Sequence, residues 1–211
     1  MDPPKLAVAG DSIIRGSYSW DNHTTTNGYD VVTYDLTNDP AYLIADQIGG
    51  VDYQNGGIGS STWNTQNTNY AQPMIDVLPR VLVMSVGVND VLTLGATWGD
   101  TLTRMNAVKT KVDAASKTVH LAVAEIIPCS DADDTEAGTI RTFNTNYAAW
   151  CTANGATLLR CHDALGKVRV STGELDDIAD AYDHGDGIHL SAAGLAALAE
   201  AVAPDLKAIK L

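Results

Sequence analysis

The apolar run Val81–Val86 constrains the fold of this chain more than any other stretch. Apolar segments of this length are expected for strands whose two faces are both covered, as in the parallel sheets of α/β proteins. Leu6–Ala9 near the start has the same character, and so has Val119–Ile127, which Pro128 ends. Short buried strands spread along the chain therefore predict a parallel sheet enclosed by helices.

Segments with helical features separate these strands. One of them begins at Pro40 and stops before two glycines, as a capped helix does. The alternation predicts a three-layer α/β/α sandwich with a central parallel sheet of about five strands and right-handed crossovers. A length of 211 residues suits a single domain spanning 1–211. The expected strands are Leu6–Ala9, Val51–Gln54, Val81–Val86, Val119–Ile127 and Ala156–Leu159, and the expected helices are 40–48, 98–117, 138–153 and 191–207. The stretch 63–78 is expected to be a polar loop that leads into a further helix, which Pro79 ends.

Two segments have no clear helical or strand pattern. Trp20–Pro40 is polar and is expected to be a long surface loop, with a strand pair at Val31–Val32 and Tyr34. Leu165–Asp180 is expected to be irregular or weakly helical. Loops as long as the first are usually functional or mobile in compact domains.

The charge of the chain limits its partners. The formal net charge is −13, from 26 acidic and 13 basic residues. Such a surface repels nucleic acid and anionic lipid, which leaves neutral or positively charged substrates. No apolar run reaches the roughly 18 residues that a membrane span needs. Met1–Lys5 shows no signal peptide, so a cytoplasmic protein and a secreted one whose signal has been removed both fit, and the oligomeric state stays open.

Ser12 is the candidate nucleophile. It follows the strand Leu6–Ala9 and the turn residue Gly10, which places its hydroxyl at the carboxyl end of a strand. In open α/β sheets ligands bind at this edge. A serine needs a base and an oxyanion hole to act as a nucleophile, so both must come from elsewhere in the chain.

The candidate base and its orienting acid lie together in Asp183–Leu190. Asp186 and His189 are three residues apart, and Gly187 between them permits a tight turn. Such a turn would place the carboxylate against one ring nitrogen and leave the other facing Ser12, as a serine hydrolase requires. Asp183 and His184 allow a metal cluster as an alternative, but no second ligand group with recognisable spacing supports one.

Three donors are available for an oxyanion hole. They are the N–H of Ser12, the N–H of Gly57 after the second strand, and the side-chain amide of Asn89 after the third. Each is a common structural feature when taken alone. Their positions at the ends of successive expected strands favour a shared site.

Four sequence blocks together resemble the SGNH, or GDSL, hydrolase family. Gly10-Asp11-Ser12-Ile13 resembles the nucleophile block, and Asn55-Gly56-Gly57-Ile58-Gly59 resembles the second block, whose glycine maps to Gly57. Gly87-Val88-Asn89-Asp90 resembles the third block and Asp186-Gly187-Ile188-His189 the last, while Ser60 departs from a usual glycine. The resemblance implies a flavodoxin-like fold and ester hydrolysis through an acyl-enzyme, without metal or organic cofactor. The G-x-S-x-G elbow of α/β-hydrolases is absent around Ser12.

The resemblance leaves the substrate open, since the family includes carbohydrate acetylesterases, lysophospholipases, thioesterases and general carboxylesterases. Trp20, Trp63 and Trp98 could stack on sugar rings at the cleft or pack in the core. With the acidic surface they favour a short acyl group, acetate above all, on a carbohydrate. A lipolytic enzyme of the lysophospholipase or thioesterase type is the alternative. A glycan-binding module without activity is a third reading, which the intact set of five candidate site residues disfavours.

The remaining candidate sites are weaker. The acidic run Asp131–Glu136 lacks the spacing of a calcium loop and is expected to be a solvated face, with calcium binding as the alternative. Cys129, Cys151 and Cys161 form no metal-binding pattern and are expected to be buried thiols, although a bridge between Cys151 and Cys161 is possible.

Overall fold

The computed structural model describes residues 5–15, 23–26, 29–32, 39–115 and 118–209. Its centre is a five-stranded sheet in the order β4-β1-β5-β6-β7. All four strand pairs are parallel, which confirms the α/β/α class and the number of strands. The strands are β1 (Leu6–Gly10), β4 (Tyr53–Gly57), β5 (Val81–Ser85), β6 (His120–Ala124) and β7 (Thr157–Leu159).

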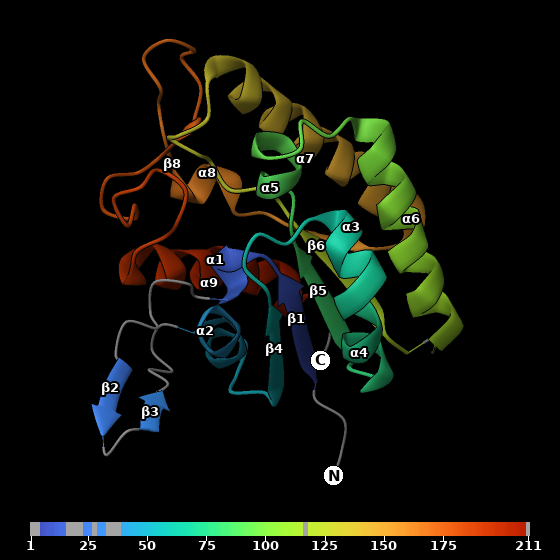
Figure 1. Ribbon diagram of the computed structural model, residues 1–211. Coiled ribbons are helices and arrows are strands. Elements are labelled where there is room, and N and C mark those ends of the chain that lie inside the picture. Colours follow the sequence, from blue (N-terminus) through green and yellow to red (C-terminus); the bar gives the residue numbers. More distant parts are fainter. Residues whose placement is uncertain (1–4, 16–22, 27–28, 33–38, 116–117, 210–211) are drawn as a thin grey trace.

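The register of β1 places the ends of three strands side by side. Gly10, its last residue, pairs with Gly57 of β4 on one side and with Ser85 of β5 on the other. The segments that leave these three strands therefore start from the same edge of the sheet, as the candidate site requires. Figure 1 shows the short helix α1 (Ser12–Arg15) at this edge.

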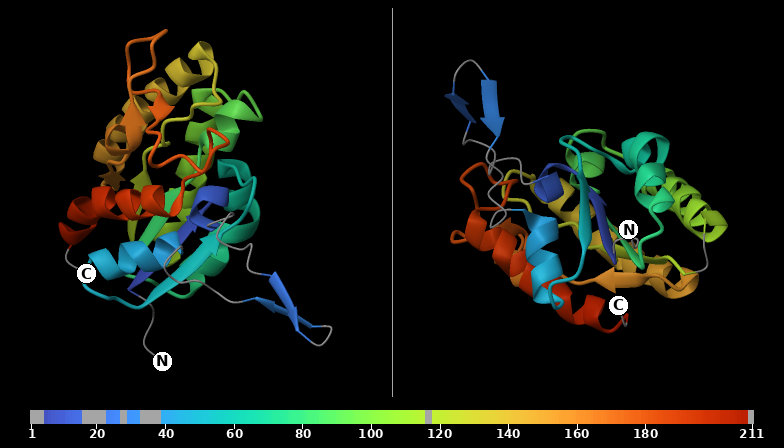
Figure 2. Two further views of the ribbon diagram at one scale, coloured as in Figure 1. Left: turned by 90° about the vertical axis from the view of Figure 1, so that its left-hand side faces the viewer. Right: turned by 90° about the horizontal axis from the view of Figure 1, so that it is seen from below.

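Helices cover both faces of the sheet, and the right-hand view of Figure 2 shows the two layers. On one face α2 (Pro40–Gln47) packs against α9 (Ala192–Lys207). On the other face α4 (Ala71–Asp76) packs against α6 (Trp98–Ala115), with α7 (Asp134–Asn154) against β6 and β7. None of the helices described is long and apolar enough to cross a membrane.

Several boundaries differ from the sequence prediction: β6, for example, ends at Ala124 and not at Ile127. Two of the differences have local reasons. The second strand was expected to end at Gln54, but β4 continues through Gly57 because its ladder with β1 does not stop at the glycines. The helix α7 starts at 134 rather than 138, because Asp133 and Glu136 form a capping box at its N-terminus. Part of the acidic run is therefore a helix start rather than only a solvated face.

The stretch 63–78, expected to be a polar loop leading into a helix, is helical from Trp63 and consists of three pieces. These are α3 (Trp63–Thr65), a π-helical turn η2 (Gln66–Tyr70) and α4. The Gln66 side chain donates to the Gly10 carbonyl at 2.7 Å and to Ser61 Oγ at 2.9 Å, so it lies against the loop beside the candidate nucleophile. π-helical turns are frequent at functional sites.

The segment expected to be irregular contains short elements. A helix α8 (His162–Leu165) leads into β8 (Gly166–Lys167), which pairs antiparallel with β9 (Asp177–Ile178). In the long polar loop, β2 (His23–Thr26) pairs antiparallel with β3 (Tyr29–Val32). The expected strand at Val31–Val32 is thereby confirmed, whereas Tyr34 and Trp20 lie outside the described residues. The remaining short helix, α5 (Val88–Leu92), follows β5.

The core settles the role of two tryptophans and three cysteines. Trp63 is fully buried and donates its ring N–H to the hydroxyl of Tyr147 at 2.7 Å. Trp98 packs its ring against Phe143 and Tyr147, with centroids 5.8 and 5.9 Å apart. Trp63 therefore belongs to the core, and the half-buried Trp98 packs against it. All three cysteines are free and buried, so Cys151 and Cys161 are not bridged.

Candidate active site

Ser12 lies where β1 ends and α1 begins. The buried carboxylate of Asp11 accepts the N–H of Ile13 at 3.0 Å, which caps the first turn of α1. Gly10 has to be glycine, since a Cβ there would lie 2.7 Å from the carbonyl oxygen of Ser85 and as close to the Ile14 side chain. The strand therefore turns sharply into the helix, and the Ser12 hydroxyl projects from the turn. The N–H of Ser12 is at the first helical position, where N–H groups have no partner inside the helix.

The structure brings Ser12, His189 and Asp186 into one chain of hydrogen bonds. Ser12 Oγ lies 2.8 Å from His189 Nε2, and His189 Nδ1 lies 2.7 Å from Asp186 Oδ2. The ring can accept the serine proton at Nε2 when Nδ1 carries the hydrogen that faces the carboxylate. The His189 side chain is 18% exposed, so the imidazole is sheltered but reachable.

The geometry of Asp186 is set by its own turn, as the spacing predicted. While Oδ2 faces the ring, Oδ1 accepts the backbone N–H groups of Ile188 and His189 at 3.0 and 2.8 Å. Gly187 has a φ of +74°, a conformation that side chains rarely adopt. The acid and base are therefore held in a fixed relation by three consecutive peptide units.

Asp183 and His184 stabilise the same turn. Asp183 Oδ1 accepts the N–H groups of Gly185 and Gly187 at 2.7 and 3.1 Å. The N–H of His184 donates to the carbonyl of His189 at 2.9 Å. Among the residues that the structure describes, no group of three or more His, Cys, Asp or Glu side chains is placed to hold a metal ion.

The candidate oxyanion donors differ in what they already contact. Asn89 Nδ2 donates one hydrogen to the carbonyl of Ser61 at 3.1 Å, and its amide carries a second. The N–H of Gly57 donates to Asn55 Oδ1 at 2.8 Å. A Cβ at Gly57 would lie 2.6 Å from the carbonyl carbon of Ile14, so this glycine is required for the contact between β4 and α1.

The loop after Gly57 shows how the chain accommodates Ser60. This serine adopts a φ of +57°, in the left-handed region that favours glycine. The departure from the usual glycine therefore places a strained residue in the loop, and Ser61, which holds Asn89, comes directly after it.

Comparison with known proteins agrees with this arrangement. The model of the GDSL-like lipase/acylhydrolase family matches residues 8–197. The chain belongs to that family. It is therefore an ester hydrolase. No curated protein matches the sequence.

Solved structures share the fold of this GDSL-like hydrolase at low sequence identity. A GDSL-like lipase from Bacteroides thetaiotaomicron has a TM-score of 0.71 at 16% identity, over 97% of this chain and 87% of that one. A carbohydrate acetylesterase from Sinorhizobium meliloti has a TM-score of 0.69 at 16% identity, over 97% and 98%. An acetyl xylan esterase from Geobacillus stearothermophilus has a TM-score of 0.68 at 17% identity, over 96% and 94%.

Two buried carboxylates lie behind the candidate site of this hydrolase, and the sequence did not single them out. Asp11 is 2% exposed and Asp90 is fully buried, and each directly adjoins a candidate site residue. Burial raises the pKa of Asp11 to about 7, and the charge of Asp90 adds to the effect. Burial also raises the pKa of Asp90 to about 6, against the hydrogen bond from the Trp63 N–H and the nearby Arg104.

Asp90 connects the segments on either side of Asn89. Its Oδ2 accepts the Trp63 N–H at 3.0 Å, at the start of α3, and its Oδ1 lies 3.7 Å from Arg104 Nη1. The carbonyl that holds Asn89 belongs to Ser61, two residues before Trp63. Asp90 thus contributes to the orientation of the Asn89 amide. The local sequence could not identify Asp90 as buried, because its burial depends on packing against the distant helix α6.

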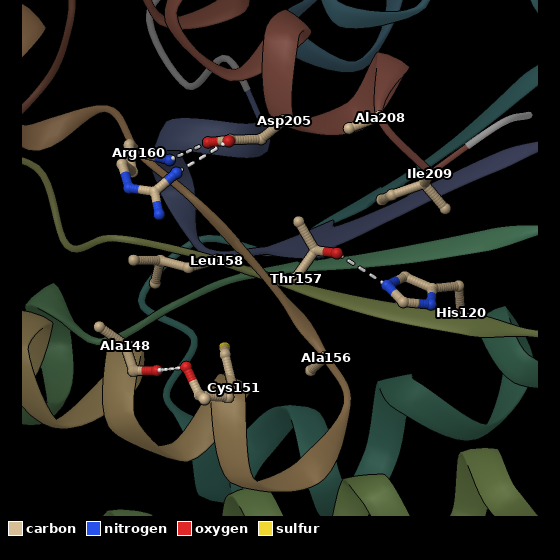
Figure 3. Close-up of a pocket in the computed structure, with 11 residues that line it drawn as sticks. His120, Ala148, Cys151, Ala156, Thr157, Leu158, Arg160, Asp205, Ala208 and Ile209 are labelled. Atoms are coloured by element: carbon tan, nitrogen blue, oxygen red, sulfur yellow. Dashed lines mark hydrogen bonds and ion pairs between the residues drawn. The ribbon is translucent and has the colours of Figure 1, made fainter.

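A cavity of about 490 Å³ elsewhere in the hydrolase does not belong to the site (Figure 3). It opens beside the edge strand β7, which β5 and β6 separate from β1. Its polar side chains are paired with one another: His120 Nε2 lies 2.8 Å from Thr157 Oγ1, and Arg160 forms an ion pair with Asp205.

Proposed function

We propose that this ester hydrolase removes short acyl groups, acetate above all, from carbohydrate esters through an acyl-enzyme formed on Ser12. The observation that carries the proposal is the hydrogen-bonded series from Ser12 Oγ through His189 to Asp186, at 2.8 and 2.7 Å. This is the arrangement by which serine hydrolases activate their nucleophile.

The first half of the reaction forms the acyl-enzyme. Ser12 Oγ attacks the ester carbonyl carbon while His189 Nε2 takes its proton, and the carbonyl oxygen becomes an oxyanion. The carboxylate of Asp186 stabilises the imidazolium that results. His189 then gives the proton to the departing alcohol oxygen, and the carbon–oxygen bond to the alcohol breaks.

The second half repeats these steps with water. His189 takes a proton from a water molecule as the water attacks the acyl carbon, and it returns the proton to Ser12 Oγ as the acid leaves. The cycle thus returns Ser12 and His189 to their starting protonation states.

The proposed oxyanion hole consists of the Ser12 N–H, the Asn89 amide and the Gly57 N–H. Asn89 retains one amide hydrogen beyond its bond to Ser61, which leaves it a hydrogen to donate to the oxyanion. The N–H of Gly57 already donates to Asn55 Oδ1, so it must break that hydrogen bond before it can donate to the oxyanion. We therefore assign the larger share of the stabilisation to Ser12 and Asn89.

The substrate class rests on two supports. The net charge of −13 disfavours anionic lipid head groups and favours uncharged alcohols such as sugars. Two of the proteins that share the fold are a carbohydrate acetylesterase and an acetyl xylan esterase. Trp63 and Trp98 add no support for a sugar substrate, because Trp63 is buried and the ring of the half-buried Trp98 packs against the core.

The test is a series of p-nitrophenyl esters from acetate to long acyl chains, followed by acetylated xylo-oligosaccharides. We expect the highest kcat/KM on acetate and release of acetate from the oligosaccharides. A preference for long chains would move the assignment to a lipolytic or thioesterase activity. No turnover of any ester would favour the glycan-binding module.

The serine is tested in the same series. Ser12→Ala should lose turnover on every ester and keep the wild-type melting temperature, because the hydroxyl is the nucleophile and not a packing group. Thr110→Ala, at an exposed threonine of α6 whose hydroxyl donates to the Asn106 carbonyl, is the matched control and should keep full activity. Wild-type turnover in Ser12→Ala would refute the mechanism.

A further inference from the structure

The turn that carries the acid and the base rests on a neighbouring segment through the Gly187 carbonyl. That oxygen accepts the N–H groups of Ser130 and Asp131 at 2.8 and 3.2 Å. The thiol of Cys129 donates to it at 3.3 Å. A Cβ on Gly187 would lie 2.9 Å from the Asp131 nitrogen, so the two backbones are in direct contact. Any displacement of the Cys129–Ala132 segment is thus passed to the peptide unit between Asp186 and His189.

Arg169 holds the Cys129–Ala132 segment from the other side. Its Nη2 donates to the carbonyl of Cys129 at 2.8 Å, and its Nη1 donates to that of Ala132 at 2.7 Å. Its Nε donates to Asp177 Oδ1 at 2.7 Å, and Asp134 Oδ1 lies 3.4 Å from Nη1. The guanidinium thus spans the segment and is fixed by carboxylates on its outer side.

The placement of Arg169 is unusual for its local sequence. It lies between Val168, which is 59% exposed, and Val170, which is fully exposed, yet it is 8% exposed itself. Burial of a cation is costly unless its donors are satisfied. The loop between β8 and β9 exposes these two valines to solvent but buries the arginine between them. This arrangement indicates that the role of Arg169 is to bind the Cys129–Ala132 segment.

Residues 176–178, at the end of this loop and in β9, form two more hydrogen bonds with the Cys129–Ala132 segment. The carbonyl of Asp176 accepts the Cys129 N–H at 3.0 Å, and the N–H of Ile178 donates to Ser130 Oγ at 2.9 Å. Ser130 therefore contacts both sides: its hydroxyl faces β9, and its N–H faces Gly187. The Cys129–Ala132 segment is held between residues 169–178 and the turn Asp183–Leu190.

We propose that Arg169 is a positioning residue for the Asp186–His189 pair, acting through the Cys129–Ala132 segment and the Gly187 carbonyl. The proposal rests on the proposed function, since it gives these two residues their catalytic role. Arg169 touches none of the reacting groups. It matters for turnover because a displacement of about 1 Å in a catalytic group can lower the rate by about 100-fold.

The main test is Arg169→Lys, which keeps the charge but offers a single nitrogen in place of the fork that reaches two carbonyls. We expect kcat on the best p-nitrophenyl ester to fall by about 10- to 100-fold with KM unchanged. We also expect the low-field proton resonance of the His189–Asp186 hydrogen bond to shift or broaden. That resonance reports on the pair directly and does not depend on turnover.

A control separates positioning from loss of stability. Val112→Ala removes two buried methyl groups from α6, away from the site, and lowers the melting temperature without touching the segment. Assayed well below both melting temperatures, it should keep kcat and the low-field resonance of the wild type. Equal losses in Val112→Ala and Arg169→Lys would overturn the proposal, and so would wild-type kcat and resonance in Arg169→Lys.

Two further variants complete the test. If Arg169→Lys does not fold, Cys129→Ala removes one of the three donors to the Gly187 carbonyl, and it should lower kcat and perturb the same resonance. Unchanged values in Cys129→Ala would then overturn the proposal. His189→Ala tests the proposed function separately: turnover that persists in it refutes the catalytic role of His189, while the resonance in Arg169→Lys still decides whether Arg169 positions the pair.

Discussion

Replacing Asp11 by asparagine should stabilise the protein, and increasingly so as the pH rises. Asp11 directly precedes Ser12 in the chain, is 2% exposed, and its ionised form is disfavoured by burial and by the charge of Asp90. Asparagine keeps the oxygen that accepts the Ile13 N–H and removes the ionisable group. The variant therefore isolates the cost of a buried negative charge from the loss of a helix cap.

The magnitude follows from the pKa. Burial raises the pKa of Asp11 from 3.8 to about 7. Between these values the folded protein retains a proton that the unfolded chain has released, so the free energy of unfolding falls as the pH rises through this window. At about 1.4 kcal/mol per pH unit, the wild type has lost about 4 kcal/mol by pH 8 through this group. Asp11→Asn avoids that loss.

Urea unfolding at pH values from 4 to 8 measures the effect. Asp11→Asn and the wild type should have similar unfolding free energies at pH 4, and the variant should gain on the wild type up to pH 8. Some decline with pH should remain in the variant, because burial also raises the pKa of Asp90 to about 6. Asp46→Asn, at an exposed aspartate, is the control, and its free energy of unfolding should not gain on that of the wild type as the pH rises. A difference between Asp11→Asn and wild type that is the same at pH 5 and pH 8 would refute the reasoning.

Two further predictions concern the oxyanion hole and the thiols. Asn89→Ala should lower kcat by about 100- to 1,000-fold, the usual cost of removing one oxyanion donor, and steady-state kinetics with an unchanged rate would exclude the amide from the site. The thiols of Cys129 and Cys151 are buried, and burial raises their pKa values to about 11 and about 12. Neither they nor the buried Cys161 should react with an aromatic disulfide reagent at pH 8 until urea is added, and rapid labelling of the native protein would contradict this.

The features that the sequence predicted well are those set by near neighbours in the chain. The apolar run at Val81–Val86 became β5 because such a run has no stable place except between two layers of helices. The Asp186–His189 turn could be anticipated because a carboxylate three residues before a histidine, across a glycine, can reach both the ring and the backbone. Even here the limits of β4 were wrong, since pairing with β1 carries that strand through Gly57.

The features that were missed depend on residues far apart in the sequence. Asp90 and Arg169 were not singled out, because charged side chains are usually exposed. Asp90 is buried only because α3 and α6 close over it, and Arg169 only because the Cys129–Ala132 segment needs its two carbonyls satisfied. The roles of Asp90 and Arg169 follow from tertiary packing, for which no local pattern exists. The capping box of α7 is different, because Asp133 and Glu136 form a local pattern that the acidic composition of the run obscured.

The distance along the chain between Ser12 and His189 also bears on biosynthesis. The two residues are 177 positions apart, and the histidine side chain comes from the turn that precedes α9. In the proposed mechanism Ser12 is the nucleophile and His189 its base, so during translation Ser12 leaves the ribosome long before the residue that would activate it. Esterase activity can then appear only after nearly the entire chain has been made and the turn Asp183–Leu190 has packed against α1. Recovery of turnover during refolding should therefore mark the completion of folding and not the formation of the sheet.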